Sequence, residues 1–177
     1  EYFGKKPKEV REYFNVLDDL HLNAFGADEF ALSKSFFDKP STKKMARETC
    51  RKHLNTVMRK WGAKTGNRLY TCFKEDKTII GDGRYNKNWL PFNCRATNDF
   101  RSVENVAYMV NVFLPPILKR AAYEKETEFS DDVHSLGEML QFLYRGCIRE
   151  DKKMNIYIPS SRMRNLLFRW LDGEFTE

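Results

Sequence analysis

The stretch from Ser130 to Leu171 limits the possible folds more than any other part of the chain, because its hydrophobic spacing changes twice. Residues 130–149 place apolar side chains at helical spacing, about 100° per residue. Met154–Ile158 is a short apolar run typical of a buried strand, and a second helical pattern follows Pro159. The first pattern has an apolar side, formed by Val133, Leu136, Leu140, Leu143, Tyr144 and Cys147. A polar side lies almost opposite, formed by His134, Glu138, Gln141, Arg145 and Arg149.

Three further apolar or aromatic runs predict strands of the same sheet. They are Leu69–Phe73, Trp89–Ala96 and Val103–Phe113. A short helix is expected at Ile117–Tyr123, after a pair of prolines that end the third run. Strands that alternate with helices favour an α/β fold, in which a mostly parallel sheet is flanked by helices.

The N-terminal part of the chain predicts a helical region. Pro7–Leu22 has apolar residues three or four positions apart, and Pro7 suits a first helical turn. A longer helix is expected at Ser41–Trp61. Its predicted buried side consists of Cys50, Leu54, Val57, Met58 and Trp61. We therefore expect two parts, a basic helical region at residues 1–66 and an α/β domain at residues 67–177.

Basic residues dominate the sequence from Lys39 to Arg68, where only Glu48 carries the opposite charge. Five of them on the long predicted helix are candidates for contact with nucleic-acid phosphates. These candidates are Lys43, Lys44, Arg47, Arg51 and Lys52. The alternative is a solvated helix face whose charges serve solubility.

Composition describes a globular chain with a preference for anionic partners. Hydrophobic residues make up 41% and aromatic residues 14%, which excludes a disordered chain. The net charge of +6 and the pI near 9.1 favour an anionic partner. The four cysteines and three histidines lack metal-ligand spacing, so no structural metal is expected. Reduced cysteines and a cytoplasmic, intracellular location fit this usage.

Neither a membrane segment nor a signal peptide is predicted. No apolar run approaches the roughly 18 residues that a membrane helix needs. The chain begins at Glu1 and not at a methionine, which is expected of a fragment, a cut domain or a processed product.

A polar loop between two predicted strands is the main candidate for a ligand site. Ligands of open α/β sheets bind at the carboxyl ends of the strands, and loops there carry function. The sequence there supplies donors for phosphate and a carboxylate that can hold an arginine: Arg95, Thr97, Asn98, Asp99 and Arg101. The glycine-rich stretch Gly81–Asn88 is also a loop, but no phosphate-binding loop of the Gly-x-x-x-x-Gly-Lys-[Ser/Thr] type occurs in the chain.

The order of these elements resembles the C-terminal RecA-like lobe of superfamily 2 helicases, over roughly residues 68–170. Ala96-Thr97-Asn98 and Arg101, followed by an apolar strand, are similar to the fifth motif of that family. Gln141, Arg145 and Arg149 are similar to its sixth motif. The sequence departs from the family at three points: a tyrosine stands where the sixth motif has glycine, the second arginine falls one residue late, and the Gly-x-Asp of the fifth motif is missing.

The resemblance implies the second motor lobe of a nucleic-acid-dependent ATPase. ATP and Mg²⁺ would be shared with another lobe, in the same or a partner chain, that supplies the phosphate loop. Arg145 and Arg149 would act as catalytic arginine fingers on the γ-phosphate, and Gln141 would position Arg145. The resemblance also implies two further sets of contacts: Thr97, Asp99 and Arg101 at the nucleotide, and Arg95 and Asn98 on nucleic acid.

Two other functions stay open. The chain can be a non-catalytic basic α/β module that binds nucleic acid or protein, or an interaction lobe descended from a helicase. The two arginines can also form solvent-exposed ion pairs with neighbouring carboxylates. A Walker-type lobe elsewhere in the protein would distinguish the motor from the binding module.

Overall fold

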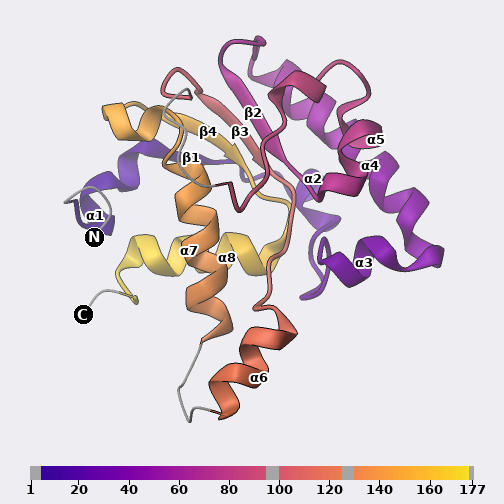
Figure 1. Cartoon of the computed structure of the whole chain (residues 1–177). Helices are drawn as coiled ribbons and strands as arrows, with labels where there is room; N and C mark the ends of the chain where they lie inside the picture. The colour runs from indigo at the N-terminus through magenta and orange to yellow at the C-terminus, as the bar shows by residue number, and fades with distance from the viewer. Residues whose placement is uncertain (1–4, 95–99, 125–129, 176–177) are drawn as a thin grey trace.

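A parallel four-stranded sheet forms the centre of the molecule (Figure 1). The computed structural model describes residues 5–94, 100–124 and 130–175. The strands are β1 (Phe14–Val16), β2 (Arg68–Thr71), β3 (Asn105–Tyr108) and β4 (Met154–Tyr157), in the sheet order β1-β4-β3-β2. All neighbouring strands run parallel, so the predicted α/β class with a parallel sheet flanked by helices is confirmed.

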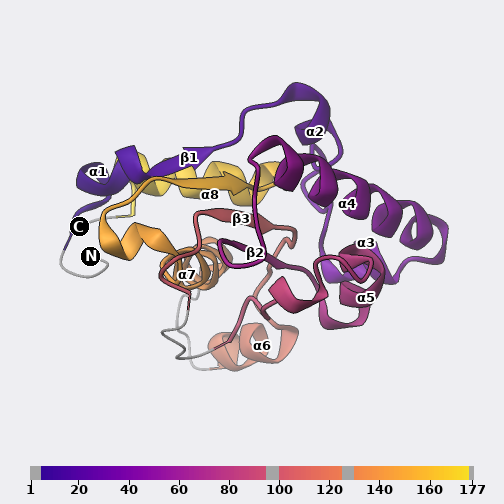
Figure 2. The same ribbon diagram turned by 90° about the horizontal axis from the view of Figure 1, so that it is seen from above.

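Helices lie on both faces of this sheet. Their bounds are Pro7–Val10 (α1), Leu20–Ala24 (α2), Lys34–Asp38 (α3), Pro40–Lys60 (α4), Lys77–Gly81 (α5), Pro116–Glu124 (α6), Asp131–Leu143 (α7) and Ser161–Asp172 (α8). Short 3₁₀ turns occupy Arg11–Tyr13, Lys74–Asp76, Asn86–Asn88 and Cys147–Glu150. Figure 2 shows α3, α4 and α5 grouped at one end of the molecule, away from α7.

Alternate side chains of the central strands belong to two different hydrophobic cores. Val106 and Tyr108 of β3 pack with α7 and α8 on one face, and α1 packs against α8. Ala107 of β3 and Tyr157 of β4 face the other side, where Leu54 of α4 is fully buried. The two-residue period of a strand makes this division possible, because successive side chains point to opposite faces.

Asparagines line up across the amino ends of three strands. Asn15 lies opposite Asn155 in β4, and Asn155 lies opposite Asn105 in β3. The amide of Asn15 donates to Asn155 Oδ1 at 2.7 Å, and that of Asn155 donates to Asn105 Oδ1 at 2.9 Å. A one-residue slip of either strand pair would break this row of side-chain bonds, so it helps to fix the register.

The helix predicted at Pro7–Leu22 is wrong. The segment contains α1, a 3₁₀ turn, the edge strand β1 and the start of α2. Residues on both sides of the expected boundary at 66 and 67 therefore contribute strands to one sheet. The longer helix is confirmed as α4, with Leu54 and Met58 among its buried residues.

Two other expectations also differ from the structure. Trp89 forms only an isolated bridge with Tyr70, and residues 90–94 form no strand, because Pro91 lacks the N–H that a ladder needs. The helix expected over residues 130–149 ends at Leu143, so α7 is shorter than predicted. Val133, expected on the buried side, is 56% exposed.

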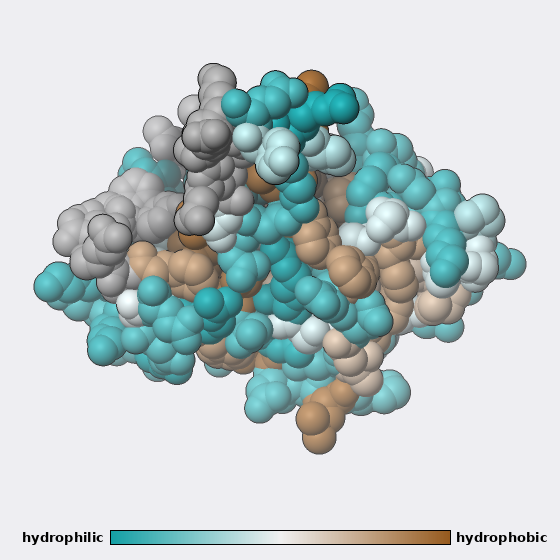
Figure 3. All heavy atoms as spheres, turned by 90° about the horizontal axis from the view of Figure 1, so that it is seen from below, coloured by the Kyte–Doolittle hydropathy of each residue, from teal (hydrophilic) through white to brown (hydrophobic). Residues whose placement is uncertain are grey.

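Helix α6 projects from the body of the molecule (Figure 1). Ile117 and Tyr123 on this helix are 76% and 88% exposed. The face seen from below carries hydrophobic residues in separate patches between hydrophilic ones (Figure 3).

Candidate nucleic-acid interface

The positive charge of the chain is concentrated in and around α4. Residues 39–68 carry ten lysines and arginines against a single acidic residue, Glu48. The whole chain has a net charge of +6, so the remaining residues are net acidic. A surface with this separation of charge attracts polyanions to one side of the molecule.

Arg47 belongs to an ion pair inside the fold. Its guanidinium contacts Asp76, whose side chain is only 2% exposed, across the gap between α4 and the 3₁₀ turn before α5. A buried carboxylate needs such a partner, because its charge is otherwise left without solvation. The structure therefore gives Arg47 a role in joining α4 to the segment before α5.

Other basic side chains of α4 point to solvent. Lys44, Lys52 and Arg59 are exposed, and Lys43 is half-buried. No ion pair links any of these four to a carboxylate among the described residues. Lys43 and Lys44 line an open pocket of about 390 Å³ with Pro40, Arg47, Glu48 and Ile79.

A second pocket, of about 210 Å³, lies between α4 and the loop that follows α5. Its lining residues are Arg51, Lys52, Asn55, Asp82, Arg84 and Tyr85. Arg84 and Asn55 were absent from the sequence-based candidates. The available signal was an arginine within a Gly-Asp-Gly loop, but nothing local indicated that this loop returns to α4.

Arg145 and Arg149, predicted to act on ATP, follow α7 and precede β4, at the amino ends of the strands. Cys147 N–H donates to Val103 O, just before β3, which ties the turn after α7 to that end of the sheet. Arg145, in this turn, is 8% exposed, whereas Gln141 on α7 is exposed. Gln141 and Arg145 therefore do not share one continuous helical face, because α7 ends between them.

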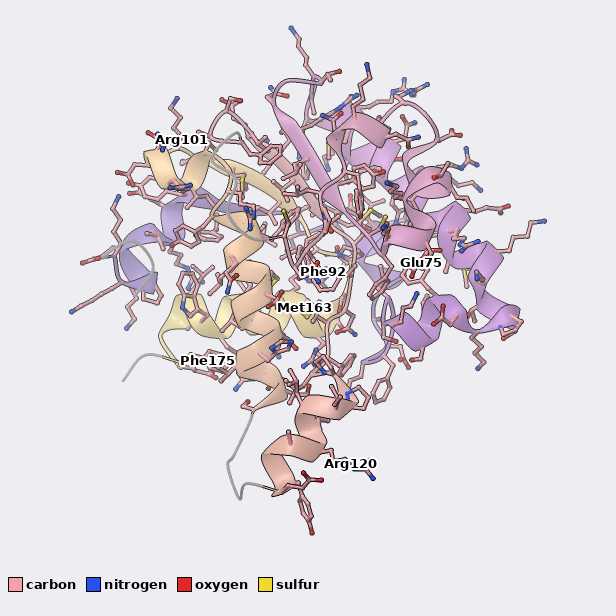
Figure 4. All side chains as sticks on the ribbon, in the orientation of Figure 1. Glu75, Phe92, Arg101, Arg120, Met163 and Phe175 are labelled. Atoms are coloured by element: carbon pink, nitrogen blue, oxygen red, sulfur yellow. The ribbon has the colours of Figure 1, made fainter. Side chains whose placement is uncertain are left out.

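The predicted loop residues are only partly described. Arg95, Thr97, Asn98 and Asp99 lie outside the described residues. Arg101 forms an exposed ion pair with Glu150 at 3.6 Å, beside the turn after α7 and far from Glu75 near α5 (Figure 4).

The carboxyl ends of β1 and β4 are one place where an open α/β sheet can bind a ligand, because the chain leaves these neighbours toward opposite faces. At this end of the sheet, the first turn of α8 already forms hydrogen bonds with other groups of the chain. Ser161 N–H donates to Gly26 O at 2.9 Å, and Ser160 Oγ accepts from Met163 N–H. A donor that a phosphate would use at a helix N-terminus is thus engaged within the chain.

The arginine nearest to this end of the sheet is also engaged. Arg162 of α8 donates to Asn111 Oδ1 and Val112 O after β3, and it pairs with Asp132 of α7 at 3.1 Å. It also lies over the ring of Phe113, 4.2 Å from the ring centre. These contacts join α7 and α8 to the end of β3.

Metal binding and cysteine chemistry find no support in the described part of the chain. It contains no group of three or more histidine, cysteine or acidic side chains arranged to hold a metal ion. None of the four cysteines is in a disulfide. Burial raises the pKa of the Cys147 thiol to about 11 and raises those of Cys50 and Cys72, so these thiols stay protonated at neutral pH. No helix within residues 5–94, 100–124 and 130–175 is both long and apolar enough to cross a membrane.

Comparison with known proteins identifies relatives over nearly the whole chain. A family model described as the YonV C-terminal Rossmann-like domain matches residues 8–171. The chain is 32% identical, over 173 residues, to the SPbeta prophage-derived uncharacterized protein YonV of Bacillus subtilis (strain 168). That alignment covers 97% of this chain and 42% of the relative, so the chain spans less than half of the relative's length. No solved structure matches the chain.

Proposed function

The chain belongs to the YonV C-terminal Rossmann-like domain family, and from the charge on α4 we propose that it binds the phosphate backbone of nucleic acid. The observation that carries this proposal is the set of exposed lysines and arginines on one side of α4. Lys44, Lys52 and Arg59 have no ion-pair partner among the described residues.

Unpaired cations on one helix suit a polyanion better than a small ligand. Each phosphate that a lysine or arginine neutralises releases bound counterions, and this release makes affinity depend steeply on salt. Lys44 and Arg59 are fifteen positions apart on the same helix, which is about 22 Å at 1.5 Å per residue. A surface of this length extends over several successive phosphates of a nucleic-acid strand.

ATP hydrolysis goes beyond what these contacts support. The motor-lobe hypothesis depends on Gln141, Arg145 and Arg149, whose similarity to a helicase motif is limited to the sequence. ATP, Mg²⁺ and a second ATPase lobe remain predictions that belong to that hypothesis. Binding of nucleic acid does not require them.

A charge-reversal experiment tests the proposal. Lys44, Lys52 and Arg59 are changed to glutamate together, and binding to labelled 20-nucleotide DNA and RNA, single-stranded and duplex, is measured by fluorescence anisotropy. Losing three phosphate contacts should raise the Kd at least about tenfold, and the slope of log K against log salt should fall by about 2 to 3.

In a matched control, Lys8, Lys152 and Lys153 are changed to glutamate. These lysines are exposed at the opposite end of the sheet. Both triple variants alter the net charge equally, so only the position of the charge differs. Equal losses in the two variants would contradict a binding surface on α4, and so would unchanged binding in the α4 variant.

A further inference from the structure

The pocket between α4 and the loop after α5 is built by a tight turn of the backbone. Helix α5 ends at Gly81, and Asp82 and Gly83 both adopt positive φ angles, 48° and 69°. A side chain at Gly81 would collide with the hydroxyl of Tyr70, because an added Cβ would lie 2.3 Å from that oxygen. The close approach at Gly81 and the left-handed backbone at Gly83 turn the chain back toward α4.

The same turn fixes the backbone on either side of Arg84. Tyr85 is buried, and the guanidinium of Arg68 lies over its ring, 4.4 Å from the ring centre. Arg68 also donates to the carbonyl oxygen of Arg84 at 3.1 Å. Arg84 therefore starts from a fixed main-chain position.

The guanidinium of Arg84 is held by α4. Asn55 Oδ1 accepts from Arg84 Nη1 at 2.8 Å and from the hydroxyl of Tyr85 at 3.0 Å. Among the described residues, Asn55 is the only side chain that Arg84 contacts through a hydrogen bond. A guanidinium has five N–H donors, so donors remain for a ligand beside α4.

The charge around the pocket is positive. Arg51, Lys52 and Arg84 supply three cations, and Asp82 supplies one carboxylate. Arg51 pairs with Asp82 at 3.3 Å, but both side chains are substantially exposed, so this pair is weak and can exchange for another anion. Phosphate has several oxygen acceptors and suits guanidinium donors that converge on one point.

We propose that this pocket is a phosphate subsite, in which Arg51, Lys52 and Arg84 bind one backbone phosphate of nucleic acid and Asn55 positions Arg84. The inference rests on the proposed binding of nucleic acid and assigns that surface a defined contact point. Asp82 competes with the phosphate for Arg51.

Single substitutions test the subsite, with labelled 20-nucleotide single-stranded DNA as the probe. Arg84→Ala should raise the Kd about fivefold and reduce the salt slope by about one. Arg84→Lys keeps the charge without the planar fork and should fall between Arg84→Ala and the unchanged protein. Asp82→Asn should lower the Kd about twofold. Lys87→Ala is the control, because Lys87 is exposed three residues away and does not line the pocket.

A double-mutant cycle tests the role of Asn55. Asn55→Ala should raise the Kd when Arg84 is present and have no effect on the Kd when Arg84 is alanine, because the residue acts only through Arg84. A purely structural role would weaken binding in both backgrounds. Additive losses would therefore overturn the positioning role, and thermal melting of each variant identifies any loss of folding.

The outcomes separate failure of the subsite from failure of the interface. If Lys87→Ala weakens binding as much as Arg84→Ala, or if Arg84→Ala has no effect while the α4 triple variant loses affinity, the subsite is wrong and the interface stands. If neither variant affects binding, both are wrong. Inorganic phosphate is the second probe. An NMR shift of Arg84 Nε–H with phosphate, in a protein that does not bind DNA, would overturn nucleic acid as the source of the phosphate.

Discussion

Ser161 N–H, in the first turn of α8, donates to the carbonyl oxygen of Gly26 at 2.9 Å. This bond joins the segment after α2 to the carboxyl end of β4. The backbones lie so close that a Cβ at Gly26 would come within 1.8 Å of Pro159 O. One place where a parallel sheet can accept a phosphate, the start of the helix after β4, is thus closed by a contact within the fold.

Replacement of Gly26 by alanine should destabilise the protein by about 3 kcal/mol or more, because the backbone at Pro159 must move. Gly137 provides the matched comparison, since an added Cβ in the middle of α7 meets nothing within 4 Å. Gly137→Ala should stabilise the protein by about 0.5 to 1 kcal/mol. Urea unfolding measures both changes, and a neutral Gly26→Ala would contradict the close contact.

Two buried tyrosines on neighbouring strands should respond differently to loss of the hydroxyl group. Tyr108 Oη has no hydrogen-bond partner among the described residues, so Tyr108→Phe should leave the free energy of unfolding unchanged or raise it by about 1 kcal/mol. Tyr157 donates to Leu22 O at 3.0 Å, so Tyr157→Phe should lower it by about 1 to 3 kcal/mol. Equal effects in thermal or urea unfolding would argue against this difference in bonding.

The stability of the protein should depend on pH through His53. Burial lowers the pKa of His53 from 6.5, the nearby His21 lowers it further, and Asp19 acts in the opposite direction. The unfolded chain binds a proton below about pH 6.5, whereas folded His53 stays neutral to lower pH. Its contribution to stability is therefore present above pH 6.5 and is lost as the pH falls below that value. The loss of unfolding free energy between pH 7.5 and 5 should be smaller in His53→Asn, and an identical loss would exclude this role.

Histidine NMR can also establish the tautomer of His53. The hydroxyl of Tyr157 has one proton, which it donates to Leu22 O, so His53 Nδ1 at 2.9 Å must donate to the tyrosine oxygen. Neutral His53 should accordingly carry its proton on Nδ1. Nitrogen shifts typical of the Nε2–H form would show that the hydrogen bonds run the other way.

Arg47 and Arg51, one turn apart on α4, should differ in their effect on stability. Arg47→Ala leaves the buried carboxylate of Asp76 without its partner and should cost about 3 to 5 kcal/mol. Arg51→Ala breaks an exposed pair with Asp82 and should cost less than about 1 kcal/mol. Chemical unfolding of the two variants makes the comparison, and similar costs would contradict the difference in burial.

Arg145 and Gln141 offer a test that also bears on the motor-lobe hypothesis. Arg145 is 8% exposed, so Arg145→Ala should destabilise the fold by about 1 to 3 kcal/mol through lost packing of its side chain. Exposed Gln141→Ala should change stability by less than about 0.5 kcal/mol. The motor-lobe hypothesis instead requires Arg145→Ala to fold normally and, in the full-length protein with its second ATPase lobe, to lose ATP hydrolysis stimulated by nucleic acid.

The strands that could be predicted from the sequence are those buried on both faces. β2, β3 and β4 overlap the apolar or aromatic runs that predicted them, as expected for strands of a parallel sheet. β1 was missed because it is three residues long and because Phe14 fits the helical spacing of Val10, Leu17 and Leu20. Its strand conformation is imposed by pairing with Met154–Ile156, which local sequence does not reveal.

The end of α7 is signalled in the sequence by Gly146, but the apolar spacing that continues past it favoured a longer helix. Apolar spacing continues to Cys147, yet Gly146 lies so close to β4 that an added Cβ would be 2.6 Å from Met154 Sδ. A glycine near the end of a helical pattern favours a helix end. The position of Arg145 at the amino end of the sheet follows from that turn and could not be obtained from periodicity alone.

The candidate site was predictable only in part. The charge of α4 is visible in the sequence, and the exposed positions of Lys44 and Lys52 agree with its helical pattern. Arg47 differs from the neighbouring basic residues because it pairs with Asp76, 29 residues away. Arg84 bonds to Asn55, which is also 29 positions away in the chain. Both contacts therefore exist only in the folded chain.

The pairing of β1 with β4 determines the order in which the strands can pair during synthesis. Asn15 and its partner Asn155 are separated by 140 positions, so β1 leaves the ribosome long before β4, its neighbour among the described strands, exists. β2 and β3 can pair with each other in the meantime. Of the described strands, the first to be synthesised must therefore wait for the last.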